Sequence, residues 1–535
     1  MPRTSLSRLL TRRPYVCQQC ARSFHKSTSQ IRQQSALSLL EERGLINQIA
    51  GYQITAHSTH RNSDRDALNK LLESRKVGFY AGIDPTAPSL HLGHLLPFMP
   101  LFWLYYHGHH VVSLVGGATA KVGDPSGRLT SRAKANEDAI QKNFESMFGQ
   151  VQGLWKNVLQ YGERHGLHRS PLGKKEVLNN AEWLHGLNVL KFLRMMGNGA
   201  RLGAMLSRDT VKNKMEKGDG MSFAEFTYPL LQAWDWWQMY EERGVQIQIG
   251  GGDQYGNIIA GVDAVKYIAQ SHAQDGAAGS WLDTEGRLKE EHSPMGVTVP
   301  LLTTSSGEKF GKSAGNAVWL EPSMTKPFDL YGFLLRSSDD DVERYLKLFT
   351  FVPVEDIAKV MVEQRGDPGK RKAQHLLASE VLELVHGAEI AKITRAEHEA
   401  SRKPTLASLT RPTEADQASA QDTASRIQLP KSLVHDTPFS RILYHAGLVE
   451  TKSEGARTIN KGGVYVATTA SHSTLAEGGQ LQFVPLQKEQ NATTVITNGL
   501  IVLRLGKWKV RVIEIVDNAD FKGDAPGWEE WKAAK

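Results

Sequence analysis

The sequence predicts an α/β fold: a Rossmann-type doubly wound parallel sheet, followed by an α-helical domain and a small α+β domain. Three patterns in the 535 residues support this prediction. Apolar runs occur at the spacing of a strand–helix–strand unit, the apolar period becomes helical after Pro327, and runs rich in Val and Ile return near the end. No apolar run approaches the ~20 residues that a membrane span needs, so we expect no membrane contact.

The elements of the sheet are expected in a regular order. Residues 76–83 (KVGFYAGI) are short, apolar and followed by a proline turn, which predicts a buried strand. Residues 94–108 are a long apolar run ending at a glycine, which predicts a helix, and residues 111–120 (VVSLVGGATA) predict the next strand. A strand–helix–strand unit of this kind places its two strands parallel. Residues 245–257 predict a further strand that runs into a glycine-rich loop.

Two polar segments are predicted to be additions to this sheet. Residues 130–200 are polar and biased toward helix, which predicts an insertion between the two halves of the sheet. Residues 269–298 are rich in glycine and charge, which predicts a surface insertion.

Composition divides the whole chain into five segments. The predicted segments are a targeting peptide at 1–40, the Rossmann domain with its insertions at 41–325, a helical domain at 326–404, a linker at 405–430 and a terminal domain at 431–535.

The positive charge of the chain is concentrated at its amino end. Seven of the 64 basic residues lie within residues 1–40, which contain no Asp or Glu, so the other 57 basic residues equal the 57 acidic ones. A segment rich in Arg, Ser and Thr without acidic residues is typical of a mitochondrial transit peptide, which predicts the matrix as the destination. Both cysteines, Cys17 and Cys20, fall in this segment, so we expect neither a disulfide nor a thiol nucleophile in the mature protein.

The stretch DPTAPSLHLGH places His91 and His94 on the first turn of the predicted helix after a strand. Ligands of open α/β sheets bind where strands end and helices begin, and Gly93 leaves room there for a base or a ribose. Imidazole donors at this point suit phosphate oxygens. The alternative is a zinc site, which needs at least three protein ligands, and neither an HExxH motif nor a cysteine partner is present.

Two further stretches suit the same kind of ligand. KFGKSAGN carries Lys309 and Lys312, whose ammonium groups suit a departing pyrophosphate, with Ser313 beside them. Tyr228 and Asp235 flank Gln232 at spacings of four and three, so they share one helix face among neighbouring tryptophans. Buried amide and carboxylate groups need partners, which a polar ligand would supply.

Together these stretches resemble the signatures of class I aminoacyl-tRNA synthetases. HLGH and KFGKS are similar to the HIGH and KMSKS motifs, with Phe310 and Gly311 in place of Met and Ser. YAGIDPTAPSLHLGH, VGGATAKVGDPSGR, EFTYPLLQAWD and GGGDQYGN are similar to the tyrosyl-tRNA synthetase family in order and spacing. The resemblance covers about 75–400 and resumes at 440–515, where the sequence resembles an RNA-binding module of a small-subunit ribosomal protein.

The resemblance implies a role for particular residues, starting with Tyr80 and Asp235 as partners of a substrate phenol. The implied tyrosine contacts are Tyr80, Asp124, Tyr228, Gln232, Asp235, Gln248 and Gln254. The implied ATP contacts are Gly82, Asp84, Gly93, Gly251, Asp253, Leu302 and Lys312. The implied catalytic groups are His91, His94, Thr86, Lys309, Lys312, Ser313, Arg128 and Arg132. Three of these, Asp124, Tyr228 and Gln232, would hold the α-ammonium group of tyrosine.

The resemblance also implies the reaction and its partners. L-tyrosine and ATP with Mg²⁺ would give tyrosyl-adenylate and pyrophosphate, and the tyrosyl group would pass to the terminal ribose of mitochondrial tRNA(Tyr). It further implies a homodimer, a helical domain on the anticodon side and a terminal domain that binds RNA. Basic residues gather in that terminal domain, which favours contact with an RNA backbone. The predicted RNA contacts are Lys452, Arg457, Lys461, Arg504 and Lys507.

Two alternatives stay open at this stage. A tryptophanyl-tRNA synthetase has the same fold, but its motif usually ends in HLGN and it lacks the terminal RNA module, so His94 and residues 440–515 argue against it. The other alternative is a non-enzymatic protein that binds group I intron RNA, a role that is also possible beside the enzymatic one. Binding of intron RNA without competition by tRNA would distinguish it.

Overall fold

The computed structural model separates the chain into two compact units, Met1–Thr394 and Arg395–Lys535, which are treated one at a time. Within the described residues no helix is both long and apolar enough to cross a membrane. The structure describes residues 34–51, 61–126, 129–130, 136–167, 171–272, 281–305, 312–313, 316–402, 425–435, 437–469, 481–487, 490–496, 499–506, 509–523 and 525–533.

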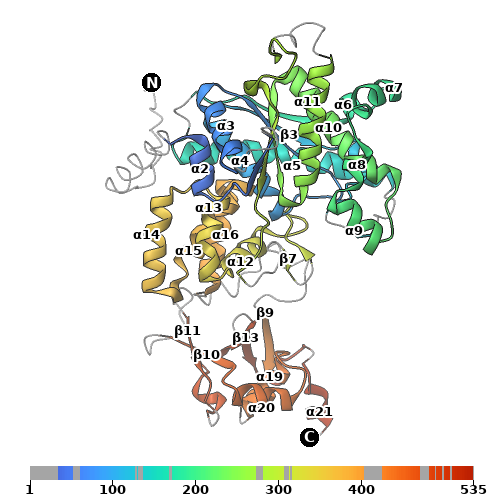
Figure 1. The fold of residues 1–535 in the computed structure, drawn as a ribbon. Coiled ribbons are helices and arrows are strands. Elements are labelled where there is room, and N and C mark those ends of the chain that lie inside the picture. Colours follow the sequence, from blue (N-terminus) through green and yellow to red (C-terminus); the bar gives the residue numbers. More distant parts are fainter. Residues whose placement is uncertain are drawn as a thin grey trace, which may run out of the picture. The chain divides into compact units, whose positions relative to one another are not determined.

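A six-stranded sheet forms the centre of the first unit (Figure 1). Five neighbouring strands are parallel, which confirms the predicted doubly wound parallel sheet. The edge strand β1 is antiparallel, which was not predicted. In spatial order the strands are β1 (Gln48–Ala50), β6 (Met295–Val299), β5 (Val245–Gly251), β2 (Gly78–Ile83), β3 (His110–Val115) and β4 (Lys175–Asn179).

The order of the strands reverses between β2 and β5. From β2 the chain proceeds outward to β3 and β4, and it then returns to the other side of β2 to form β5 and β6. Tyr80 on β2 and Gln248 on β5 are paired in register across this boundary. Ligands of open α/β sheets bind outside the carboxyl ends of the strands at such a reversal.

Each face of the sheet is covered by its own helices and core. Phe79 and Ala81 belong to the core that includes helix α4 (Leu92–Tyr106) and helix α5 (Glu137–Arg164). Tyr80, between them in the sequence, belongs instead to the core with helices α10 (Phe223–Arg243) and α11 (Tyr255–His272). Because successive side chains of a strand point to opposite faces, this alternation directs Tyr80 toward α10.

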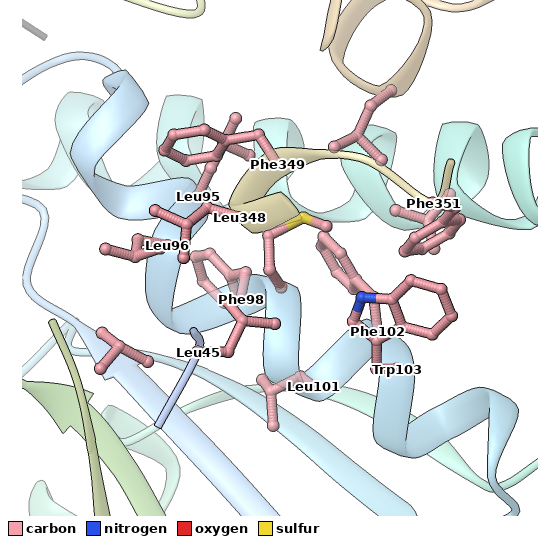
Figure 2. Close-up of a cluster of buried hydrophobic side chains, with 14 of the residues drawn as sticks. Leu45, Leu95, Leu96, Phe98, Leu101, Phe102, Trp103, Leu348, Phe349 and Phe351 are labelled. Carbon is pink, nitrogen blue, oxygen red and sulfur yellow. The ribbon is translucent and has the colours of Figure 1, made fainter. Parts of the chain in front are cut away.

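Helix α4 is buried nearly all round and joins the sheet to the helical region. Figure 2 shows Phe98 and Trp103 of α4 packed with Phe349 and Phe351, which lie at the end of α13 (Asp339–Phe349) and just beyond it. A helix that is apolar on every side is stable only inside a core, which explains the long apolar run at 94–108. The segment predicted as a helical domain contains the helices α12 (Pro327–Leu335), α13, α14 (Val354–Gly366), α15 (Lys372–His386) and α16 (Ala388–Arg402).

The structure corrects two of the predicted insertions. The segment 130–200 contains β4, an edge strand of the main sheet, and the segment 269–298 runs into β6, which is buried along its whole length. Strand β4 escaped prediction because only Leu178 on it is fully buried, so no continuous apolar run marks it. Strand β6 was hidden by the charged residues that precede it.

Two of the predicted segment boundaries, near residues 40 and 430, also differ in the structure. Helix α2 (Ala36–Glu42) packs four apolar side chains into the main core, so the folded unit starts before residue 40, and a removable leader has to end ahead of α2. Cys17 and Cys20 lie outside the described residues. Residues 425–430, expected as linker, form strand β9 (Ser425–Pro430), whose short alternation of Ile427 and Leu429 is hidden in a polar stretch.

The second unit contains a five-stranded sheet in the order β11-β10-β12-β13-β9. Strand β9 pairs parallel with β13, and the other neighbours are antiparallel. The remaining strands are β10 (Val464–Thr469), β11 (Leu481–Pro485), β12 (Leu500–Leu505) and β13 (Lys509–Val516), and the helices are α18 (Lys431–Val434), α19 (Phe439–His445), α20 (Lys452–Asn460) and α21 (Trp528–Ala533).

Candidate active site

A buried phenol without a partner marks the inner end of the site. The Tyr80 side chain is 1% exposed, and its Oη has no hydrogen-bond partner among the described residues. Burial first, and the nearby carboxylate of Asp235 second, raise the pKa of Tyr80 well above its ordinary value. A buried hydroxyl without a partner costs free energy, so a ligand that bonds to it gains affinity.

Asp235 on α10 is the second polar group at this end. It is 3% exposed, and burial raises its pKa from 3.8 to about 7, although hydrogen bonds from Asn180 Nδ2 (2.9 Å) and Trp183 Nε1 (2.7 Å) oppose the rise. Asn180 and Trp183 lie in the segment expected to be an insertion, and the sequence analysis missed both because no motif surrounds them. They fix the direction of the Asp235 carboxylate beside the Tyr80 hydroxyl.

A chain of hydrogen bonds connects this end to the mouth of the sheet. Asn180 Nδ2 also donates to Thr119 Oγ1 (2.9 Å), and Thr119 Oγ1 donates to Asp84 Oδ1 (2.7 Å). Tyr228 Oη donates to the other oxygen of Asp84 (2.7 Å). Asp84, predicted as an ATP contact, is therefore hydrogen-bonded to Tyr228, one of the predicted tyrosine contacts. Thr119 was not predicted, since it follows the paired glycines of a stretch interpreted only as a strand.

The predicted ammonium-binding residues form a second polar cluster. Asp124 Oδ2 accepts a bond from Gln254 Nε2 (2.7 Å), and Asn257 Nδ2 lies 3.1 Å from Gln232 Oε1, 3.2 Å from Gln254 Oε1 and 3.2 Å from Ser126 Oγ. One amide nitrogen carries two hydrogens, so the acceptors around it outnumber its donors. An ammonium group with three donors complements such a cluster. Asn257 was missed by the sequence analysis, although it stands in the quoted GGGDQYGN.

The two histidines lie together at the start of α4. His91 is the N-cap residue, and its ring stacks on that of His94 at 3.7 Å and 15°. His91 Nδ1 accepts the Gly93 N–H (3.1 Å), and His94 Nδ1 accepts the His91 N–H (3.2 Å), so in the neutral form each Nε2 carries the proton. Burial, then the charge of His91, lowers the pKa of His94 to about 3. His94 therefore offers a neutral N–H donor at physiological pH rather than a cation.

The His91 side chain gives a second reason for a glycine at position 93, beside the approach of a ligand. A Cβ at this position would lie 2.9 Å from Cε1 of His91, so a side chain would displace the imidazole. The sequence analysis assigned the glycine only to ligand approach. The contact with His91 is a second and more direct reason.

The chain that follows the second motif returns to the histidines. Strands β7 (Lys312–Ser313) and β8 (Asn316–Ala317) pair with each other, and the next residues bond to the His91 segment through Leu92 N to Val318 O (3.1 Å) and Leu320 N to Leu90 O (2.8 Å). The two motifs, more than 200 residues apart in sequence, thus lie in one region.

Other predicted residues are placed with less detail. Gln248 is buried beside Tyr80, Leu302 is buried in the main core, and Gly82, Thr86 and Asp253 are exposed. A Cβ at Gly251 would come within 2.5 Å of Asp253 Oδ1. The predicted residues outside the described part of the chain are Arg128, Arg132, Lys309 and Lys507.

In the second unit the predicted RNA contacts differ in environment. Lys452, Arg457 and Lys461 are exposed on or next to α20, with Lys452 3.5 Å from a carboxylate oxygen of Glu530. Arg504 on β12 is half-buried, with its guanidinium 4.4 Å and 4.6 Å from the centres of two aromatic rings, those of Tyr465 and Phe483. Arg504 is therefore held by packing, unlike the solvated cations of α20.

Comparisons with known proteins agree with this geometry. Residues 72–401 match the family model "tRNA synthetases class I (W and Y)", and residues 417–531 match "Tyrosyl-tRNA synthetase C-terminal domain". The chain is 42% identical over 509 residues to the mitochondrial tyrosine–tRNA ligase of Podospora anserina, which covers 91% of this chain and 76% of the relative. It is 40% identical over 364 residues to that of Saccharomyces cerevisiae, 68% of each chain. A C-terminally truncated mitochondrial tyrosyl-tRNA synthetase of Aspergillus nidulans superposes with a TM-score of 0.61 and 44% identity over 71% of this chain and 99% of that one.

Proposed function

Because this chain belongs to the class I tRNA synthetases of the tryptophan and tyrosine family, we propose that it is a tyrosine–tRNA ligase of the mitochondrion. The observation that carries the choice of tyrosine is the buried, unpartnered hydroxyl of Tyr80 beside the Asp235 carboxylate. A phenol that donates to Asp235 and accepts from Tyr80 would satisfy both groups. The match of residues 417–531 to a tyrosyl-type terminal domain supports tyrosine over tryptophan.

The remaining residues fit the two steps of this reaction. We propose that the oxygens of Asp124, Gln232 and Gln254 hold the tyrosine ammonium group, which directs its carboxylate toward the α-phosphorus of ATP. In-line attack forms tyrosyl-adenylate and releases pyrophosphate, and the terminal ribose hydroxyl of tRNA then takes the tyrosyl group as AMP leaves. The protein supplies orientation and donors for the developing charge, so it needs no nucleophile of its own.

The phosphate end of the site is assigned to the histidine pair. Each Nδ1 accepts a backbone N–H, so we propose that the Nε2 side of each ring faces the phosphate oxygens. Lys309 and Lys312, with Arg128 and Arg132, are proposed as the cations of this end. Mg²⁺ is proposed to enter on ATP, since this ion binds mainly through substrate phosphates and water.

The other partners are proposals of the same kind. We place the enzyme in the mitochondrial matrix, with mitochondrial tRNA(Tyr) as its RNA substrate and the cations of α20 as backbone contacts. A group I intron RNA stays a prediction from the resemblance.

A homodimer is supported by apolar side chains on the surface of the first unit. These residues lie on or next to short helices between β4 and α10 and at the start of α10, where Leu190 is 72% and Phe223 80% exposed. Exposed apolar side chains that are concentrated in one stretch of chain favour an interface. The residues of this apolar surface are Val189, Leu190, Leu193, Leu202, Leu206, Met215 and Phe223.

The direct test of the function is ATP–pyrophosphate exchange with each of the twenty amino acids. The proposal expects exchange with tyrosine and little with any other amino acid, followed by charging of a tRNA(Tyr) transcript. Exchange that depends on tryptophan would assign the chain to the other branch of the family. An absence of exchange with all twenty, together with tight RNA binding, would favour a non-enzymatic RNA-binding role.

A further inference from the structure

The segment that carries Lys312 and Ser313 is anchored at both of its ends. Its far end, at Val318–Leu320, bonds to the strand-like residues around His91, and Glu321 N adds a bond to Ser89 Oγ (3.1 Å). Its near end, at residues 303–305, bonds instead to helix α13 of the helical region. The anchor on α13 lies outside the substrate pocket, and the function proposed above gives it no role.

Asp341 is the centre of the near anchor. Its side chain is buried, and its Oδ2 accepts three hydrogen bonds: from Ser338 Oγ (2.7 Å), from Ser305 Oγ (3.1 Å) and from Ser305 N (3.2 Å). Burial alone would raise the pKa of Asp341, but the bonds from Ser338 and Ser305 outweigh it and lower the pKa. The carboxylate is therefore ionised at neutral pH, with its Oδ2 held by these three bonds.

The two bonds from Ser305 to Asp341 are not needed to cap helix α13. Ser338 is the N-cap of α13, and its Oγ accepts the Asp341 N–H (3.1 Å), which satisfies the helix end. The bonds to Ser305 cross to a segment 36 residues earlier in the sequence. One turn further along α13, Arg344 and Tyr345 both donate to the carbonyl oxygen of Thr303, the latter at 3.3 Å. Side chains of helix α13 thus bind the backbone of the segment at Thr303 O and at Ser305 N.

The geometry points to Asp341 as a positioning residue for tyrosine activation. This inference rests on the function proposed above. Ser305 stands four residues before Lys309 and seven before Lys312, so we infer that the bonds to Asp341 restrain the stretch of chain that leads into this motif. Phosphoryl transfer to a carboxylate depends on such placement, and an error of about 1 Å in a catalytic group can cost on the order of 100-fold in rate.

The inference predicts that the two steps of the reaction respond differently. Activation requires the motif cations at the departing pyrophosphate, whereas transfer to tRNA begins after pyrophosphate has left. Loss of the anchor should therefore slow adenylate formation and leave transfer from preformed adenylate intact. Affinity for tyrosine should also stay unchanged, because Asp341 contacts none of the residues assigned to the amino acid.

The experiment uses the full chain with Asp341→Asn, Ser305→Ala and the double variant. Asp340→Asn is the matched control, since Asp340 is the preceding carboxylate on α13 and is exposed. Single-turnover formation of tyrosyl-adenylate, transfer to tRNA(Tyr), tyrosine binding and the melting temperature are measured for each. We expect Asp341→Asn to slow adenylate formation roughly 10- to 100-fold. Ser305→Ala should also slow adenylate formation. The double variant should be no slower than Asp341→Asn, because both changes disrupt the same contact between Ser305 and Asp341.

Three results would overturn the inference. One is an Asp341→Asn enzyme as fast as Asp340→Asn. Another is a parallel loss of activation, transfer and melting temperature, which would make Asp341 a residue of stability only. The third is full additivity of the two single changes. A wild-type chain that activates no tyrosine would instead refute the proposed function, and this inference with it.

Discussion

Asn180 donates one hydrogen bond to the Asp235 carboxylate and another to Thr119, both at 2.9 Å, so a single amide holds the two halves of the tyrosine site in register. The bond to Asp235 opposes the cost of burying that carboxylate. Thr119 transmits the constraint to Asp84 and so to Tyr228. The groups proposed to contact the two ends of tyrosine therefore belong to one connected hydrogen-bond network.

Replacement of Asn180 by alanine should weaken tyrosine use. Asn180→Ala removes a bond to a charged group, worth about 1.5–3 kcal/mol, so kcat/KM for tyrosine should fall by roughly 10- to 100-fold in ATP–pyrophosphate exchange. Asn188→Ala is the control, because Asn188 is an amide that bonds only to backbone N–H groups at the start of a nearby short helix. Equal activity of the two variants would contradict the role of Asn180.

The raised pKa of Asp235 predicts a pH-dependent stability. Its pKa is 3.8 when unperturbed and about 7 in the fold, so the folded state holds the proton more tightly between these values. Stability from this group is therefore present at low pH and is lost as pH rises from about 4 to about 7. Asp235→Asn removes the cost of ionisation. The melting temperature of the variant relative to wild type should therefore increase as the pH rises over this range. A constant difference between the two proteins from pH 4 to pH 8 would show that Asp235 titrates normally.

A buried ion cluster should set the stability of the junction between sheet and helical region. Glu380 on α15 accepts bonds from Tyr161 Oη (2.7 Å), Arg164 (2.6 Å) and His165 Nε2 (2.9 Å) of α5 and the residue after it. Burial opposes ionisation, but His165 and Arg164 lower the pKa of Glu380 to about 2. Glu380→Gln should cost about 3–5 kcal/mol in urea unfolding. The neighbouring Glu383→Gln, which breaks a more exposed pair with Arg164, should cost less than ~1 kcal/mol.

The proposed dimer interface can be tested with one charge. Leu190→Glu should convert a protein with the mass of two chains into one with the mass of a single chain in sedimentation equilibrium, because a carboxylate cannot be buried in an apolar contact. Val362→Glu is the control, since Val362 is an equally exposed apolar residue on α14, outside the proposed interface. A wild-type protein that is monomeric at micromolar concentration would refute the proposed homodimer.

The fold could be predicted from the sequence where the residues of a single segment form a distinctive pattern. The apolar period of α4 and the glycine at its end identify the helix, and the motifs around His91 and Tyr228 identify their residues because residue type and spacing are both distinctive. Strand β4 was missed because an edge strand buries few side chains, and strand β9 because it is short and follows a polar stretch.

The supporting residues of the site depend on tertiary contacts and have no local signal. Asn180 and Trp183 both donate to Asp235, which is 55 and 52 residues away in sequence. Arg43 received no role in the sequence analysis, yet it is buried and donates to the carbonyls of Thr350 and Val352. An arginine of this kind looks like any surface charge until its acceptors are known.

The most direct test of the phenol site compares tyrosine with phenylalanine in ATP–pyrophosphate exchange. Tyr80→Phe deletes only a buried hydroxyl that has no partner among the described residues, so kcat/KM for tyrosine should fall by roughly tenfold, about 1.5 kcal/mol, while the value for phenylalanine stays the same or rises. Tyr240→Phe, which deletes a buried hydroxyl bonded to the His292 carbonyl, serves as the control and should leave the ratio unchanged. If Tyr80→Phe lowers both values equally and keeps the ratio of wild type, Tyr80 does not contact the phenol and the account of the site is wrong.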